Sequence, residues 1–319
     1  MLDAPLIFQP LFMERIWGGR RLATICSKSL PPRIPIGEAW EIVDRPEAQS
    51  VVRDGPWRGR TLHEIWTENR KEIFGSVAAS ERFPLLIKIL DAKEKLSLQV
   101  HPPEEAAAEL GGEAKTEFWY VAEARPDAEI FVGLKKNRTR AHIEEALARG
   151  DVEEHVHRLR VKRGDAMFLP SGRMHAIGGG NVIIEVQQNS DTTYRVFDWN
   201  RVDDKGAPRQ LHVEQALRSI NFHDHEPSLV RPTDESLVRH DLFEVDKWKL
   251  NASREISPRG TFAIVVCLTG KIECAAMTFT AGDVFLLPAN LRERTLQPLE
   301  TETSLLRVTI PDESNARAR

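Results

Sequence analysis

A seven-residue motif occurs twice in this sequence, and the repeat limits the possible folds more than any other feature. The first copy, GDAMFLP, begins at Gly164, and the second, GDVFLLP, begins at Gly282. Each copy follows a basic or polar turn and leads into an apolar segment with the character of a strand. The simplest explanation is that the chain contains two copies of one β-unit.

Short alternating segments between turn residues also predict a β-rich chain. The sequence has 19 Gly and 19 Pro, spread over its whole length. Polar and apolar residues alternate in 96–101 and 192–199, as in strands with one buried face. In the first of these segments Ser97, Gln99 and His101 share a face. Because no strand–helix–strand pattern with a GxGxxG fingerprint occurs, we expect an all-β dominated fold, a sandwich or barrel, with a few short helices.

Capping and stop signals predict the positions of these helices. Thr61 followed by Glu64 is a capping box, and Thr139 is a second N-cap candidate. Gly75 and Gly150 are stop signals. The predicted helical segments are 62–74, 104–110, 141–149 and 211–219.

The length of 319 residues predicts about two domains, at roughly 150 residues each. A polar stretch with two prolines, FHDHEPSLVRPTDESLV, lies between the two motif copies. We therefore expect an N-terminal domain over 1–222, a linker over 223–238 and a smaller C-terminal domain over 239–319. In the second copy Glu293 takes the place of His175. The C-terminal domain is therefore expected to bind no metal.

The charge balance argues against nucleic-acid and membrane partners. Lys plus Arg (44) and Asp plus Glu (48) give a net charge of −4, and no block of like charge is long enough to follow a phosphate backbone. The longest strongly apolar run, 262–268, is far shorter than the ~20 residues of a membrane helix. The first residues, MLDAPLIFQP, lack a basic region before an apolar stretch. We expect a cytoplasmic protein.

The three cysteines, Cys26, Cys267 and Cys274, form no CxxC pair and no even-numbered framework. This usage is typical of a reducing compartment and excludes a thiolate zinc cluster. Cys267 and Cys274 flank the hairpin-like segment 268–271. We expect the two cysteines to face each other across this turn as reduced thiols.

Metal-binding side chains occur in three segments around the first motif copy. Gln99 and His101 lie in SLQVHP, Glu117 lies in KTEFWY, and His175 lies in SGRMHAIG. Two imidazoles, a carboxylate and an amide as a possible fourth ligand suit Zn²⁺, with Fe²⁺ or Mn²⁺ as competitors. Such a set leaves an open position, which is typical of a catalytic metal. Polar surroundings argue against ligand roles for His155, His157, His223 and His225.

The segments LLIKILDAKEKLSLQVHP, KTEFWYV, VKRGDAMFLPSGRMHAIG and EVQQNSDTTYRVFDWNR together resemble the type I mannose-6-phosphate isomerases of the short bacterial kind. The resemblance covers nearly the whole chain. It implies a pair of cupin-type jelly-roll barrels, the N-terminal one holding one zinc ion. By motif, the implied ligands are His101, Glu117 and His175, with Gln99 as a possible fourth. Arg195 matches the catalytic arginine of the family, and Lys115 matches a lysine that lines the site.

Two positions depart from the family pattern. The family usually has a histidine–proline pair after its GExW strand, whereas this sequence reads Asp44–Arg45–Pro46. Pro103 follows QVHP, where Asn is common. Both positions are expected on the rim of the pocket. The first removes any role of the usual histidine, and the effect of Arg45 there is left open.

The residue types suit the interconversion of an aldose and a ketose. This reaction removes a proton next to a carbonyl and passes through an enediolate, whose negative charge a divalent cation stabilises. Lys115 is expected on the same side of its strand as Glu117, and Arg195 offers a fork for phosphate or enediolate oxygens. Lys88 and Ser97 are candidate phosphate contacts. The proton acceptor is open between a metal-bound hydroxide, Lys115 and a nearby carboxylate.

We therefore expect an enzyme of carbohydrate metabolism that interconverts mannose 6-phosphate and fructose 6-phosphate with zinc. One alternative is an Fe²⁺-dependent oxygenase on the same barrel. The other is a sugar-phosphate-binding protein that does no chemistry. Lys115 and Arg195 favour the isomerase, because an anionic substrate needs cations. The native metal, the substrate range and the oligomeric state are not fixed by the sequence, although a monomer is favoured.

Overall fold

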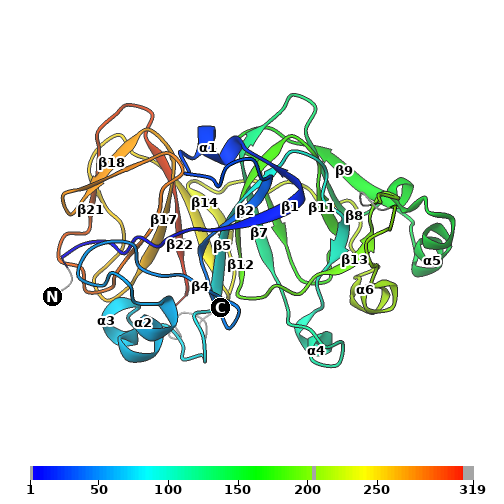
Figure 1. Cartoon of the computed structure of the whole chain (residues 1–319), viewed down its shortest axis with the longest axis horizontal. Coiled ribbons are helices and arrows are strands. Elements are labelled where there is room, and N and C mark those ends of the chain that lie inside the picture. The colour runs from blue at the N-terminus through cyan, green and yellow to red at the C-terminus, as the bar shows by residue number, and fades with distance from the viewer. Residues whose placement is uncertain (1–2, 203–205, 312–319) are drawn as a thin grey trace.

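The computed structural model describes residues 3–202 and 206–311, and its strands form two antiparallel β-barrels that lie side by side (Figure 1). The first barrel contains a six-stranded and a five-stranded sheet. The six-stranded sheet has the order β1 (Leu11–Gly19), β2 (Ile36–Ile42), β5 (Leu85–Ala92), β12 (Asn181–Gln188), β7 (Glu117–Ala124) and β10 (Ala166–Leu169). The five-stranded sheet has the order β13 (Tyr194–Phe197), β6 (Leu98–Val100), β11 (His175–Ile177), β8 (Glu129–Leu134) and β9 (Val156–Arg160).

The second barrel, drawn in yellow to red in Figure 1, contains a five-stranded and a four-stranded sheet. The first has the order β14 (Ser236–Arg239), β15 (Glu244–Lys249), β22 (Ser304–Thr309), β17 (Ala263–Thr269) and β20 (Val284–Leu287). The second has the order β16 (Arg254–Glu255), β21 (Thr295–Pro298), β18 (Lys271–Cys274) and β19 (Met277–Thr280). A small ribbon pairs β3 (Asp44–Arg45) with β4 (Ala48–Gln49). The prediction of an all-β dominated fold with two related barrels is confirmed.

The two copies of the repeated motif form the same turn in the two barrels. Gly164 and Gly282 both have positive φ, at 95° and 89°, which favours glycine. The Asp165 carboxylate accepts a hydrogen bond from the backbone N–H of Lys162 at 2.9 Å. The Asp283 carboxylate accepts one from the N–H of Thr280 at 2.7 Å. Each turn then leads into a strand, β10 in the first barrel and β20 in the second. The sequence repeat therefore indicates that the same structural unit occurs in both barrels.

The six-stranded sheet is covered on both faces. On β5, the side chain of Leu90 packs with the interior of the first barrel, whereas Ile87 and Ile89 pack with the core shared with the second barrel. All eight residues of β5 are buried. This burial explains why the segment reads as a nearly continuous apolar run and not as an alternating one.

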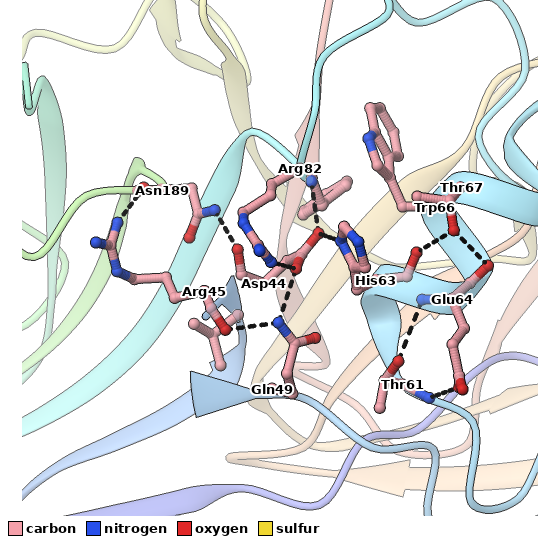
Figure 2. Close-up of polar contacts among 12 residues, drawn as sticks. Asp44, Arg45, Gln49, Thr61, His63, Glu64, Trp66, Thr67, Arg82 and Asn189 are labelled. Carbon is pink, nitrogen blue, oxygen red and sulfur yellow. Dashed lines mark hydrogen bonds and ion pairs between the residues drawn. The ribbon is translucent and has the colours of Figure 1, made fainter. Parts of the chain in front are cut away.

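Helices are few and short, as predicted. The predicted segment 62–74 is divided at Asn69, and the capping box of Thr61 and Glu64 opens its first part (Figure 2). The predicted segment 104–110 is helical only over its first turn. A short helix after β1 was not predicted. The helices are α1 (Arg21–Ile25), α2 (Leu62–Glu68), α3 (Arg70–Ile73), α4 (Glu104–Ala107), α5 (Arg140–Arg149) and α6 (Val213–Ser219), with a 3₁₀ turn at Val152–His155.

The N-terminal part of the chain packs against the second barrel as well as the first. Leu6 forms an isolated β-bridge with Leu286, and the backbone N–H of Ala289 donates to the carbonyl of Ile73 at 2.7 Å. The rings of Phe74 and Phe262 are 5.4 Å apart in an edge-to-face arrangement. The blue N-terminal segment and α2–α3 accordingly lie along the second barrel in Figure 1.

The predicted division into 1–222, 223–238 and 239–319 stays a prediction. Within the predicted linker, the backbone N–H of Val230 donates to the carbonyl of Ala166 at 2.8 Å, so this segment runs along the first barrel. Its last residues belong to β14, which pairs with β15. Residues 1–2, 203–205 and 312–319 of the predicted domains lie outside the described part of the chain.

The predicted hairpin between Cys267 and Cys274 is wrong. Strand β17 pairs with β20 and β22, whereas β18 pairs with β19 and β21. The chain therefore passes from one sheet to the other at Gly270, which has a φ of 73°. A turn signal between two apolar segments is the same for a hairpin and for a corner of a barrel. All three cysteines are buried free thiols.

No helix in the described residues is long and apolar enough to cross a membrane.

Candidate metal centre

Three side chains from distant segments meet inside the first barrel. His101 follows β6, Glu117 begins β7, and His175 begins β11. Their ligand atoms all lie within 4.8 Å of one another, and each residue is only 1% exposed. His101 Nε2 lies 3.2 Å from Glu117 Oε1, and His175 Nε2 lies 3.5 Å from Glu117 Oε2. The three predicted ligands are therefore close enough to share one ion.

Strand pairing explains how these residues meet. Gln99 of β6 lies opposite His175 of β11 and also opposite Arg195 of β13. Residues directly opposite each other in antiparallel strands have side chains on the same face. The Gln99 amide nitrogen lies 3.2 Å from His175 Nε2. The orientation of an amide group is assigned from its hydrogen bonds, so its oxygen can take this place and serve as the possible fourth ligand.

Backbone carbonyls fix the orientation of both imidazoles. His101 Nδ1 lies 2.7 Å from the carbonyl oxygen of Thr192, and His175 Nδ1 lies 2.8 Å from that of Arg173. A carbonyl only accepts hydrogen bonds, so each Nδ1 is the protonated nitrogen. Each Nε2 then presents a lone pair towards Glu117. Metal-binding histidines are commonly held in this way.

The polar atoms at the centre of this group have few partners within the protein. His101 Nε2 and Glu117 Oε2 are buried and make no hydrogen bond, and Glu117 Oε1 is buried beside the ammonium group of Lys115. Buried polar atoms nearly always have a hydrogen-bond partner. Two nitrogen lone pairs and a carboxylate that converge without protons between them form a donor set for a cation. The residues therefore fit a divalent metal ion.

The pKa values favour the protonation states that a metal requires. Burial and the nearby Lys115 lower the pKa of His101 to about 3. Burial also lowers the pKa of His175. Burial alone would raise the pKa of Glu117, but Lys115 and His101 hold it well below its usual value. Neutral imidazoles and an ionised carboxylate are the forms that bind metals.

Lys115 lies on the same side as Glu117, as the two-residue spacing predicts. Its Nζ is 2.6 Å from Glu117 Oε1, and the residue is 4% exposed. Burial opposes the charged form of Lys115, but Glu117 and Glu185 raise its pKa above the usual value. The ammonium group is therefore a fixed positive charge at the edge of the donor set.

A second buried ion pair lies on the six-stranded sheet, which also carries Glu117. Lys88 Nζ is 3.4 Å from Glu185 Oε1, and Trp119 Nε1 donates to Glu185 Oε2 at 2.8 Å. Burial and the nearby Glu117 raise the pKa of Glu185. The Trp119 ring also packs edge to face with His175, with centroids 5.2 Å apart. Glu185 thus belongs to the site.

Sequence analysis did not single out Glu185. The available signal was a lone acidic residue in the apolar strand segment NVIIEVQQ, which mirrors the lone lysine in LLIKILDA. The register of β12 on β5 places Glu185 opposite Lys88. Without that register, the two charges cannot be recognised as partners.

Arg195 faces the same side of its sheet as Gln99. Its Nη1 donates to the carbonyl of Gln210 at 2.7 Å, while its Nε has no partner. Asp198, a conceivable partner, instead binds Arg201 and Arg209. In the described part of the chain, no carboxylate lies within ion-pair distance of Arg195. Its charge is therefore available to an anionic ligand. Ser97 is also buried, at 5% exposure.

Comparison with known proteins agrees with this geometry. A family model of the type I phosphomannose isomerase catalytic domain matches residues 6–136. Mannose-6-phosphate isomerase ManA of Bacillus subtilis is 37% identical over 313 residues, which cover 93% of this chain and 97% of that protein. The chain belongs to the type I phosphomannose isomerases.

Two further members of the family support the assignment. The mannose-6-phosphate isomerase of Streptococcus mutans is 37% identical over 301 residues, covering 90% of this chain and 93% of that protein. The crystal structure of the mannose 6-phosphate isomerase from Bacillus subtilis superimposes with a TM-score of 0.84 at 34% identity, over 96% of this chain and all of that chain. The similarity to type I phosphomannose isomerases thus extends over both barrels.

In this family member, the described residues contain one group of His, Cys, Asp and Glu side chains suited to a metal, and that group is His101, Glu117 and His175. In the second barrel Glu293 is exposed, whereas the adjacent Arg294 is buried at 3% exposure.

Proposed function

We propose that the chain interconverts mannose 6-phosphate and fructose 6-phosphate with one zinc ion held by His101, Glu117 and His175, and with Gln99 as a fourth ligand. The observation that carries this proposal is the buried, converging set of His101, Glu117 and His175 donor atoms in a member of the type I phosphomannose isomerases. A set of nitrogen and oxygen ligands without cysteine suits a catalytic zinc ion.

When bound, the zinc ion stabilises negative charge on the oxygens of the substrate as a Lewis acid. The chain's own residues do the rest. Lys115 keeps its proton, so it places a positive charge beside the reacting oxygens and is not the base. Arg195 offers a planar fork to the developing enediolate. Lys88 and Ser97 are the proposed contacts of the phosphate group.

We assign the proton transfer to Glu185. A base removes the proton from C2 of mannose 6-phosphate, and the electron pair of that C–H bond forms the C1–C2 double bond as the C1 carbonyl becomes an enediolate oxygen. The hydroxyl proton on O2 moves to O1, and return of the first proton to C1 then leaves a hydroxyl at C1 and a carbonyl at C2, which is fructose 6-phosphate. Glu185 is buried beside Lys88, its Oε1 makes no hydrogen bond, and burial raises its pKa, which makes its carboxylate a stronger base.

The proposal is tested on the purified full-length chain. We expect fructose 6-phosphate to form from mannose 6-phosphate, to stop after chelation and to resume when zinc is added. Oxygen uptake with no isomerisation would indicate the oxygenase alternative. Saturable sugar-phosphate binding without turnover would indicate a non-catalytic protein. Either result would reject the proposal.

The role of Glu185 has its own test. Glu185→Gln keeps the shape and the hydrogen bond from Trp119 but removes the base. We expect turnover to fall by about 10²–10⁴-fold, the range for a lost general base. Exchange of the C2 hydrogen of mannose 6-phosphate with solvent deuterium should be lost in parallel, while zinc content stays at the wild-type level. Undiminished exchange would assign the proton transfer elsewhere.

A monomeric state and a cytoplasmic location stay predictions. Size-exclusion chromatography with light scattering tests the first, and cell fractionation tests the second.

A further inference from the structure

Arg45, which stands where the family usually has a histidine, joins two loops at the edge of the metal site. Its Nη1 donates to Glu113 Oε2 at 2.8 Å and to the carbonyl oxygen of Asn189 at 2.7 Å, the second of which is drawn in Figure 2. Its Nε donates to Glu47, which lies close to it in the chain. The Arg45 side chain is only 14% exposed. One guanidinium group thus holds two segments that are far apart in sequence.

Both segments lead directly to the proposed metal ligands. Glu113 comes just before Lys115 and Glu117. Asn189 comes just before Thr192, whose carbonyl accepts the Nδ1 proton of His101. Arg45 therefore lies behind the segments that position two of the three ligands.

The two loops are also bonded to each other. The backbone N–H of Glu113 donates to Thr192 Oγ1 at 2.9 Å, and Ser190 Oγ donates to the carbonyl of Glu113 at 3.3 Å. The N–H of Thr116 donates to Gln188 Oε1 at 2.8 Å. A shift of either loop would therefore move the other, and it would move the Thr192 carbonyl with them.

A buried carboxylate fixes the strand that carries Arg45. Asp44 is fully buried and accepts hydrogen bonds from Gln49 Nε2 at 2.9 Å, from Arg82 Nη1 at 3.0 Å and from the backbone N–H of Phe83 at 2.9 Å (Figure 2). His63 Nδ1 lies 3.2 Å from Asp44 Oδ2. This network holds β3 in place, so Arg45 extends from a rigid support.

The side-chain amide and the backbone carbonyl of Asn189 both bond to β3. Its side-chain amide donates to the carbonyl of Asp44 at 2.6 Å, and its own carbonyl accepts from Arg45. Its backbone N–H donates to the carbonyl of Pro84 at 2.9 Å. Without Arg45, the carbonyl of Asn189 and the carboxylate of Glu113 would both lose their shared donor.

A cavity of about 640 Å³ opens beside these loops, and Arg45, Glu113 and Ser190 are among the residues that line it. The two N–H groups of Nη1 make the two loop contacts, while Nε donates to Glu47. An imidazole has at most one N–H on each of two opposed nitrogens, so it cannot make both loop contacts from one atom.

We propose that Arg45 is a positioning residue for the metal site, because it clamps the Glu113 and Asn189 loops in the arrangement that His101 and Glu117 need to bind zinc. This inference deepens the proposed function and rests on it. It is tested through zinc affinity, which can be measured whether or not the protein turns over mannose 6-phosphate.

The experiment measures zinc affinity by competition with a chromophoric chelator, using the full-length chain and Arg45→Ala. We expect affinity to fall at least about tenfold, the lower end of the range for residues that orient ligands. Amide hydrogen exchange over 188–192 should become faster. Arg45→Lys should restore part of the affinity, because it keeps the charge near Glu113.

Two control variants separate positioning from general stability. Glu47→Ala removes the partner of Arg45 that lies on neither loop, and it should leave zinc affinity within twofold of wild type. Arg294→Ala removes a buried arginine from the second barrel, away from both loops, so it should lower the melting temperature without lowering zinc affinity.

Zinc affinity unchanged in Arg45→Ala would overturn the proposal, as would an equal loss in Arg294→Ala, since stability alone would then explain the effect. If the wild-type chain binds zinc but forms no fructose 6-phosphate, the proposed function fails while the clamp is still tested by the same titrations.

Discussion

Each barrel has its own copy of the repeated turn and of the strand that follows it, but the residues after the motif differ between the two barrels. In the first barrel, His175 points into the interior, and its neighbours His101 and Glu117 have buried polar atoms without partners. In the second barrel, Glu293 is exposed and Arg294 is buried instead. Arg294 donates to four backbone carbonyls and one hydroxyl, those of Ser257, Pro288, Ala289, Thr261 and the Ser257 side chain.

The difference shows that the hydrogen-bond partners of a buried polar group indicate whether its role is structural or ligand-binding. A guanidinium has five N–H donors, and in Arg294 all five are used within the protein, so nothing more is needed there. In the first barrel, His101 Nε2 and Glu117 Oε2 keep lone pairs that make no hydrogen bond within the protein. One strand arrangement therefore supports a structural polar group in one barrel and a ligand site in the other.

The largest expected effect comes from His175→Ala. Loss of one of the proposed histidine ligands should remove bound zinc and bring isomerisation below detection, as measured by metal analysis and by fructose 6-phosphate formation. The matched change in the second barrel, Glu293→Ala, should alter neither quantity, because an exposed side chain is replaced. Zinc retained at the wild-type level in His175→Ala would contradict the proposed ligand set.

Arg195→Ala should give the next largest effect. If Arg195 contacts the developing enediolate, turnover should fall about a hundredfold, or about 3 kcal/mol, as for a lost oxyanion donor, with KM nearly unchanged. Arg218→Ala is a suitable control, since this arginine of α6 pairs with exposed Glu109 outside the site. A raised KM with unchanged turnover would instead assign Arg195 to the phosphate group.

Arg294→Ala tests the second barrel. It leaves several buried carbonyls without donors, and we expect a loss of about 3 kcal/mol in the free energy of unfolding, measured by urea denaturation. Zinc content and turnover at a temperature well below the transition should equal those of the wild type. A fall in zinc content in this variant, compared with Glu293→Ala, would mean that the second barrel controls the metal site.

The smallest expected effect is a difference in pH dependence between the barrels. The folded pKa of His101, about 3, lies below its usual value of 6.5, so the unfolded state binds more protons between these values. The metal-free protein should therefore lose stability as pH falls through this window. His101→Gln should flatten this dependence in urea titrations.

The second barrel should instead limit stability at high pH. Burial raises the pKa of the Cys274 thiol from 9.0 to about 12, so the unfolded state releases this proton first. Stability should fall as pH rises between these values, and Cys274→Ser should reduce that fall. The slope of the unfolding free energy against pH is compared between each variant and the wild type. If His101→Gln has the wild-type slope at low pH, or Cys274→Ser has it at high pH, the proposed difference between the barrels is contradicted.

Strand periodicity, the repeated motif and the family resemblance together predicted two barrels and three candidate metal ligands, and the structure brings these three side chains together. Alternation tells which residues share a face, so Gln99 and His101 were expected together, and the motif order added Glu117 and His175. The same patterns do not tell which sheet a strand joins. The predicted hairpin at Gly270 failed for this reason, because β17 and β18 belong to different sheets.

Long-range partners were the other gap. Glu185 becomes part of the site only through its register with Lys88, and Arg45 acquires its role only because Glu113 and Asn189 fold to its side. These contacts join residues that are distant in sequence, and their energies depend on burial that a single sequence does not contain.

The packing of the N-terminal part on the second barrel has a consequence for protein synthesis. Phe74 and Leu6 leave the ribosome long before their partners Phe262 and Leu286. At roughly 5–20 residues per second, the apolar faces of α2 and α3 wait for at least about ten seconds with no barrel to cover them. The nascent chain therefore offers a hydrophobic surface to chaperones during this interval, and faster elongation between these segments would shorten it.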